Sequence, residues 1–170
     1  MSLKPEIIKH LADKSAAGLP EVWQAPVEEI RKNTLSHLAL SQPLIDIYKV
    51  EHKTIAGPTS ELPIRIYRPS DKNDLPVLVF FHGGGWVLNF LDIYEPALRK
   101  VAKNGEFVII AVQYQKAPEQ PFPTPFNDFS KVSLIVLTHS LSSFFPNWKI
   151  VLFCICLNSW SLKGFVIFKL

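Results

Sequence analysis

The sequence has little cysteine, and the spacing of the two residues present excludes two classes of protein. Cys154 and Cys156 are the only cysteines among 170 residues, and a single residue separates them. This spacing is neither the Cys-x-x-Cys of a metal or redox site nor the framework of a disulfide-rich secreted domain. We therefore expect a reducing, cytoplasmic setting and no metal site.

Long uninterrupted apolar runs are also missing. The first ten residues mix charged and apolar side chains and contain no apolar stretch of signal-peptide length. Later apolar stretches are interrupted by His139, Pro146, Lys149 and Lys163, so none reaches the roughly 20 residues of a membrane span. We expect neither export nor a transmembrane helix.

Acidic residues are absent after Asp128, although the chain contains 15 of them. The net charge of +3 therefore arises in the final segment, where four lysines are scattered without arginine clusters. Scattered lysines are not typical of a nucleic-acid-binding surface, and we expect no nucleic-acid partner. Because composition changes here, we divide the chain into an ordinary globular part, residues 1–131, and an atypical apolar, acid-free tail, residues 132–170.

Residue periodicity predicts the local elements of residues 1–131. Helices are expected from Pro5 to Gly18 and from Pro26 to Gln42-Pro43, each with one apolar side. Residues 47–55 and 62–69 read as an antiparallel hairpin around turn residues 56–60.

Two fully apolar runs then predict buried parallel strands. Residues 77–81 and 107–112 have the pattern of strands covered on both faces, and a helical pattern ending at Asn104-Gly105 lies between them. Another helix is expected near Pro125. This order predicts the α/β fold class, and residues 150–157 are the best candidate in the tail to pair with the open apolar edge of the sheet.

Three glycines follow the first of these buried strands. Backbone N–H groups without Cβ atoms can turn toward a reacting carbonyl and stabilise the oxyanion that develops there. Taken alone, Gly83-Gly84-Gly85 is better explained as a plain flexible turn.

A second motif makes the pattern specific. His82-Gly83-Gly84-Gly85-Trp86, followed some thirty residues later by Tyr114 and Ala117-Pro118-Glu119-x-Pro121-Phe122-Pro123, resembles the paired signatures of the hormone-sensitive lipase family of esterases. The resemblance covers about the first three-quarters of the chain. It implies the N-terminal portion of an α/β-hydrolase fold, with cap helices in residues 1–45, a sheet with helices in residues 46–131, and an incomplete sheet.

The resemblance also implies roles for individual residues. The amides of Gly84 and Gly85 are implied oxyanion donors, His82 is implied to brace their loop without moving a proton, and Trp86 to pack behind it. The resemblance also implies supporting roles for Gly83, Tyr114, Pro118 and Glu119. It implies that Asp128 is a carboxylate that starts a helix or braces a loop. Gln113-Tyr114-Gln115 replaces the usual Asp-Tyr-Arg, which removes an expected ion pair, and Asn89 replaces a usual glycine.

The nucleophile of the family is missing. Its serine lies between glycines in a strained Gly-x-Ser-x-Gly turn, and no serine of this chain lies between two glycines. The later strands that bear the acid and the general-base histidine are also absent, so we assign no catalytic residue. We interpret the chain as a truncated, inactive member of a family whose complete form hydrolyses small carboxylic esters without metal or cofactor.

Two alternatives remain open at the level of sequence. One is a non-catalytic protein that binds a ligand in the former substrate pocket. The other is that residues 132–170 are a product of translation past a lesion and that the chain is a remnant without a selected function. Neither the ester preference of the parent enzyme nor the oligomeric state follows from the sequence.

Overall fold

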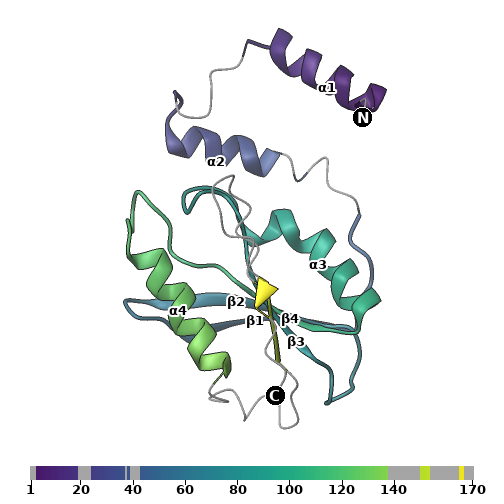
Figure 1. The fold of residues 1–170 in the computed structure, drawn as a ribbon, viewed down its shortest axis with the longest axis vertical. Helices are drawn as coiled ribbons and strands as arrows, with labels where there is room; N and C mark the ends of the chain where they lie inside the picture. The colour runs from purple at the N-terminus through teal and green to yellow at the C-terminus, as the bar shows by residue number, and fades with distance from the viewer. Residues whose placement is uncertain are drawn as a thin grey trace.

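The computed structural model describes residues 3–18, 24–36, 38, 43–137, 150–153 and 165–166, and for residues 10, 14, 36, 150–153 and 165–166 it describes the backbone alone (Figure 1). The elements in chain order are α1 (Pro5–Ala16), α2 (Val27–Ser36), β1 (Lys49–Ala56), β2 (Glu61–Arg68), β3 (Val77–Phe81), α3 (Leu91–Gly105), β4 (Val108–Val112), α4 (Thr124–Leu137), β5 (Ile150–Phe153) and β6 (Phe165–Val166). The α/β class expected from the sequence is confirmed.

The strands form one mixed sheet in the order β1-β2-β4-β3-β5-β6. The predicted hairpin is present, since β1 and β2 pair antiparallel from Lys49 opposite Arg68 to Ala56 opposite Glu61. Its turn closes with a hydrogen bond from the N–H of Gly57 to the carbonyl oxygen of Ser60, 2.9 Å.

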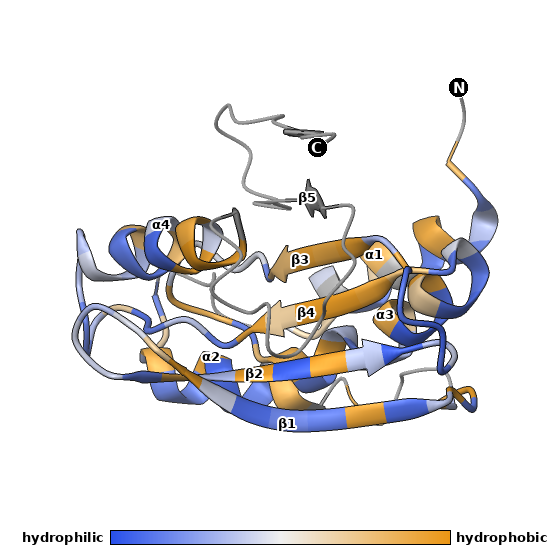
Figure 2. Ribbon diagram, turned by 90° about the horizontal axis from the view of Figure 1, so that it is seen from below, coloured by the Kyte–Doolittle hydropathy of each residue, from blue (hydrophilic) through white to orange (hydrophobic). Residues whose placement is uncertain are grey.

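The centre of the sheet consists of the two apolar runs. β3 and β4 pair in parallel from Val77 opposite Val108 to Phe81 opposite Val112, and all ten residues are buried. Figure 2 shows these strands apolar along their length, whereas β1 and β2 mix polar and apolar residues. A strand that is apolar on both faces requires cover on both faces.

Helices α3 and α4 supply that cover from opposite sides (Figure 1). Val77, Val79 and Phe81 of β3 share one core cluster with Val132 and Val136 of α4. The alternate residues of β3 point the other way, and they pack in a second cluster with α3. That cluster contains Leu78, Phe80, Leu91, Leu98 and Ala102.

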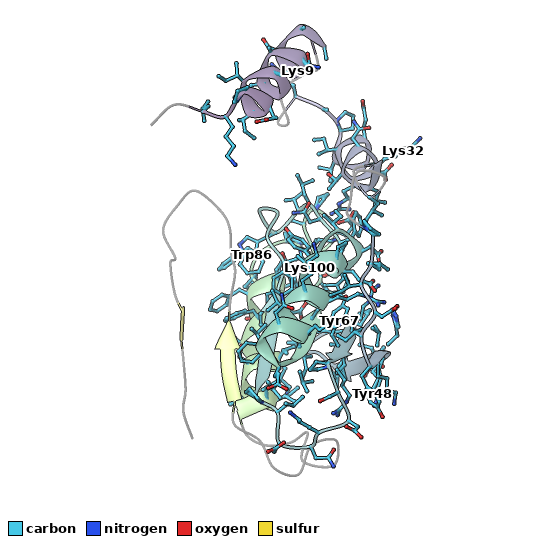
Figure 3. The ribbon with its side chains drawn as sticks, turned by 90° about the vertical axis from the view of Figure 1, so that its right-hand side faces the viewer. Lys9, Lys32, Tyr48, Tyr67, Trp86 and Lys100 are labelled. Atoms are coloured by element: carbon cyan, nitrogen blue, oxygen red, sulfur yellow. The ribbon has the colours of Figure 1, made fainter. Side chains whose placement is uncertain are left out.

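The two N-terminal helices lie outside this core, and α1 is the more distant (Figures 1 and 3). The apolar side of α1 is exposed, with 54% of Ile8 and 50% of Leu11 accessible. Helix α2 extends to Ser36, and residues 37 and 39–42, on which the end expected at Gln42-Pro43 depends, lie outside the described ranges.

The tail contributes to the sheet. β5 pairs in parallel with β3, from Val77 opposite Ile150 to Val79 opposite Leu152, as expected for the segment 150–157. Residues 154–157 lie outside the described ranges. The compositional boundary after residue 131 falls inside α4, because Val132 and Val136 are buried in the same cluster as the strands before them.

Within the described ranges, no helix is both long enough and apolar enough to cross a membrane.

Candidate active site

The candidate site lies where the chain changes direction across the sheet. From β3 the chain passes through α3 to β4 on one side, and from β4 through α4 to β5 on the other side of β3. Ligand sites of open α/β sheets lie outside the carboxyl ends of strands at such a point. The segment that leaves β3 here is residues 82–89, called the glycine loop below, and its Trp86 lies at the end of the sheet toward which β5 points (Figure 3).

The backbone of the glycine loop takes conformations that favour glycine. Gly84 has φ +132° and Gly85 has φ +65°. The N–H groups of Val87 and Leu88 both donate to the carbonyl oxygen of Gly84, at 3.1 and 2.8 Å, and close a turn. A Cβ atom on Gly84 would lie 2.5 Å from the carbonyl oxygen of Leu88, so the turn has no room for a side chain.

Asn89 anchors the far end of this loop. Its φ of +72° lies in the left-handed region, which asparagine tolerates better than most residues, so it can stand where the family usually has glycine. Its side-chain amide donates to the carbonyl oxygen of Gly83, 2.8 Å, and to the hydroxyl of Tyr94, 3.0 Å. Asparagine therefore adds a brace that glycine lacks.

His82 is almost completely buried, with 1% of its surface exposed. Its Nδ1 lies 2.9 Å from the carbonyl oxygen of Gly83, which places the ring proton on Nδ1. Nε2 then accepts, and the side-chain amide nitrogen of Gln113 lies 3.5 Å from it. Burial lowers the pKa of His82 to about 4, so the ring is neutral at pH 7.

Tyr114 joins the end of β3 to the segment after β4. Its hydroxyl donates to the carbonyl oxygen of His82, 2.6 Å. Its ring stacks on the imidazole of His82 with centroids 4.3 Å apart, and meets Trp86 edge-on at 5.3 Å. Trp86 itself packs against the core cluster that includes Tyr114. The two motifs that are thirty residues apart in sequence are thus in direct contact.

Neutral amides occupy the positions of the family's ion pair. Asp128, fully buried in the second turn of α4, accepts from the backbone N–H of Gln115 at 2.9 Å and from its side-chain amide at 3.2 Å. Gln113 accepts the N–H of Leu91, 3.2 Å, at the start of α3. Hydrogen bonds therefore replace the charge pair that the sequence leaves out.

The segment 114–123, called the proline loop below, carries Pro118 and Glu119 on its exposed side. A backbone hydrogen bond from the N–H of Ala117 to the carbonyl oxygen of Trp86, 2.9 Å, ties the proline loop to the glycine loop. Arg31 of α2 forms an ion pair with Glu119, and this pairing lowers the pKa of Glu119 to about 2. The sequence gives no signal for Arg31, because its partners lie 56 to 88 residues away and leave no periodic pattern.

Lys116 is a second residue that the sequence did not single out. Its ammonium donates to the carbonyl oxygen of Asn89, 2.6 Å, and lies over the ring of Phe90 at 3.9 Å. Burial lowers the pKa of Lys116 to about 8. The contact adds a further link between the two loops.

A surface pocket of about 290 Å³ lies beside these loops rather than at the glycines. It is lined by residues that include His52, Arg65, Phe90 and Gln113, and by none of Gly83, Gly84 and Gly85. Among the residues that the structure describes, no three His, Cys, Asp or Glu side chains gather as metal ligands.

Comparison with known proteins agrees with this architecture. A family model described as alpha/beta hydrolase fold matches residues 78–153. Carboxylesterase NlhH of Mycobacterium tuberculosis is 33% identical over 102 residues, which are 59% of this chain and 32% of that protein. An arylesterase of Saccharolobus solfataricus is 30% identical over 128 residues, 75% of this chain and 42% of that protein.

Solved structures show the same likeness. A hyperthermophilic esterase from the archaeon Pyrobaculum calidifontis superposes with a TM-score of 0.74 at 26% identity, covering 89% of this chain and 50% of that one. The chain thus spans half or less of the length of the relatives named here. The chain carries the N-terminal portion of the α/β-hydrolase fold, and it is similar in sequence and structure to the carboxylic ester hydrolases named here.

Proposed function

We propose that this chain provides the oxyanion-binding part of a carboxylic ester hydrolase, whose complete form cleaves small esters through a serine acyl-enzyme. Gly84 and Gly85 are the proposed donors to the carbonyl oxygen of the ester. His82, Gly83, Trp86, Tyr114, Pro118, Glu119 and Asp128 are the proposed supports of that geometry. The two closely spaced cysteines support a reducing, cytoplasmic setting for it.

The observation that most directly supports this proposal is the shape of the glycine loop at the carboxyl end of β3. Gly84 takes part in the hydrogen bonds of the described residues through its carbonyl oxygen, and its N–H donates to none of them. Gly85 is exposed, whereas Gly83 is buried. A turn with the half-buried Gly84 and the exposed Gly85 beside the switch point of the sheet is suited to bind an anionic oxygen.

The surrounding contacts make these donors rigid before any ligand arrives. Asn89 and His82 both contact the carbonyl oxygen of Gly83, and Tyr114 donates to the carbonyl oxygen of His82. A fixed donor stabilises charge in the transition state without reorganising, and removing one such donor costs about 3–4 kcal/mol of activation free energy in other acyl-transfer enzymes. His82, neutral and with both ring nitrogens partnered, serves as a support rather than as a base.

The reaction itself requires a serine that the chain does not provide. The strained elbow of the family needs glycines beside the serine, and the 170 residues contain no such arrangement. We therefore infer that the chain binds the acyl group or its anion without forming an acyl-enzyme.

Nuclear magnetic resonance of the isotope-labelled chain tests the binding. Titration with butyrate, a carboxylate of the size of a small acyl group, is expected to shift the amide signals of Gly84 and Gly85 saturably. Gly18, which also has positive φ but lies after α1, is expected not to shift and serves as an internal control. Shifts that fail to saturate, or equal shifts at Gly18, would contradict the proposed oxyanion site.

Hydrolysis of 4-nitrophenyl butyrate tests the absence of turnover. The wild-type chain is expected to release 4-nitrophenol no faster than a Gly84→Pro variant. Release well above that variant, proportional to protein concentration, would show that the chain is active as it stands.

A further inference from the structure

Arg31 makes contacts with three residues, which belong to the two loops of the site. Its Nε donates to the carbonyl oxygen of Val87 in the glycine loop, 2.9 Å, and its Nη2 donates to the carbonyl oxygen of Ala117 in the proline loop, 2.7 Å. The same guanidinium binds the carboxylate of Glu119 through Nη1 at 2.5 Å and Nη2 at 3.0 Å. One side chain of α2 thus joins both loops.

The position of Val87 gives this contact its importance. The N–H of Val87 donates to the carbonyl oxygen of Gly84, so Val87 belongs to the turn that presents the glycine amides. Arg31 holds the opposite side of the same residue, and its own side chain is only 14% exposed. Displacement of the guanidinium would free the carbonyl oxygen of Val87 and the outer side of the turn together.

Arginine is suited to this arrangement in a way that lysine is not. The planar guanidinium carries five N–H donors, and here it directs two of them to one carboxylate and two to carbonyl oxygens at fixed angles. An ammonium offers a point charge on a flexible stem and cannot reproduce this fork. The pairing with Glu119 raises the pKa of Arg31 above its ordinary value, so the group stays charged.

We propose that Arg31 is a positioning residue that couples the docking of α2 to the order of the glycine loop. The proposal rests on the oxyanion role proposed for that loop. The amide geometry of Gly84 and Gly85 then depends on a residue in the N-terminal helical segment. A ligand or contact that moves α2 therefore changes anion binding at a loop more than fifty residues away.

Residue-resolved hydrogen exchange of the full chain tests the coupling. An Arg31→Gln variant is expected to increase the exchange rates of the Val87 and Leu88 amides at least tenfold, while amides of β4 keep their wild-type rates. Arg31→Lys is expected to behave in the same way, because it retains charge without the fork. Lys32→Gln is the matched control, since Lys32 is the exposed neighbour on the same helix (Figure 3).

A butyrate titration of the same variants separates positioning from general stabilisation. The dissociation constant at Gly84 is expected to rise at least fivefold in Arg31→Gln and to stay unchanged in Lys32→Gln. Uniform acceleration of exchange across the sheet, or an unchanged dissociation constant in Arg31→Gln, would overturn the coupling. Absence of butyrate binding in the wild-type chain would instead overturn the oxyanion assignment, and selective exchange at Val87 and Leu88 would then still support the link from α2 to the loop.

Discussion

Replacing Gly84 by alanine tests whether backbone conformation sets the shape of the glycine loop. Gly84 has φ +132°, where residues with a Cβ atom are strained by about 1–3 kcal/mol. The added Cβ would also lie 2.5 Å from the carbonyl oxygen of Leu88 and 2.8 Å from its carbonyl carbon. Both are backbone atoms, so the contact can be relieved only by moving the chain.

That movement disturbs a hydrogen bond as well as the backbone. Leu88 N donates to the carbonyl oxygen of Gly84 at 2.8 Å, and a typical hydrogen bond contributes about 1 kcal/mol. Adding this contribution to the strain, we expect Gly84→Ala to lower the free energy of unfolding by about 2–4 kcal/mol. Urea denaturation followed by tryptophan fluorescence measures the loss, and the circular dichroism transition should coincide with it.

Gly18→Ala is the matched control for positive φ alone. Gly18 has φ +58°, and an added Cβ there would meet nothing within 4 Å. The left-handed conformation then costs about 1–2 kcal/mol at most. Equal losses in the two variants, or a Gly84→Ala protein as stable as the wild type, would refute the argument that the contact with Leu88 fixes the turn.

Two further predictions concern buried polar groups of the site. The pKa of His82 is lowered to about 4 by burial, below the ordinary 6.5, so its contribution to stability is complete above pH 6.5 and is lost as the pH falls toward 4. At pH 5 this linkage lowers the free energy of unfolding by about 2 kcal/mol. Urea denaturation should show the loss in the wild type but not in His82→Gln. A His82 ring that titrates near pH 6.5 by nuclear magnetic resonance would contradict the prediction. Asp128→Ala leaves the N–H of Gln115 unpaired and is expected to cost about 1–3 kcal/mol, whereas Asp128→Asn keeps an acceptor and should lose less. Equal losses of unfolding free energy in the two Asp128 variants would show that the oxygen acceptor for the N–H of Gln115 does not contribute to stability.

Much of the sheet was predictable because its signals are local. A run of five apolar residues, Val77–Phe81, has few alternatives to a strand buried on both faces, and the turn residues around Gly57 predict a hairpin. The motifs beginning at His82 and Tyr114 are also local signals, and the structure brings their two segments into contact.

The strands, the order of the two motifs and the absence of a serine between glycines follow from the residue pattern alone. How the glycine loop is held depends on the packed structure, because its supports come from distant segments. Arg31 binds Glu119, which lies 88 residues away in the sequence, and Asp128 of α4 accepts a hydrogen bond from the N–H of Gln115 outside that helix. Such bonds depend on the distance and angle between groups on separate elements, which packing fixes and residue spacing does not encode.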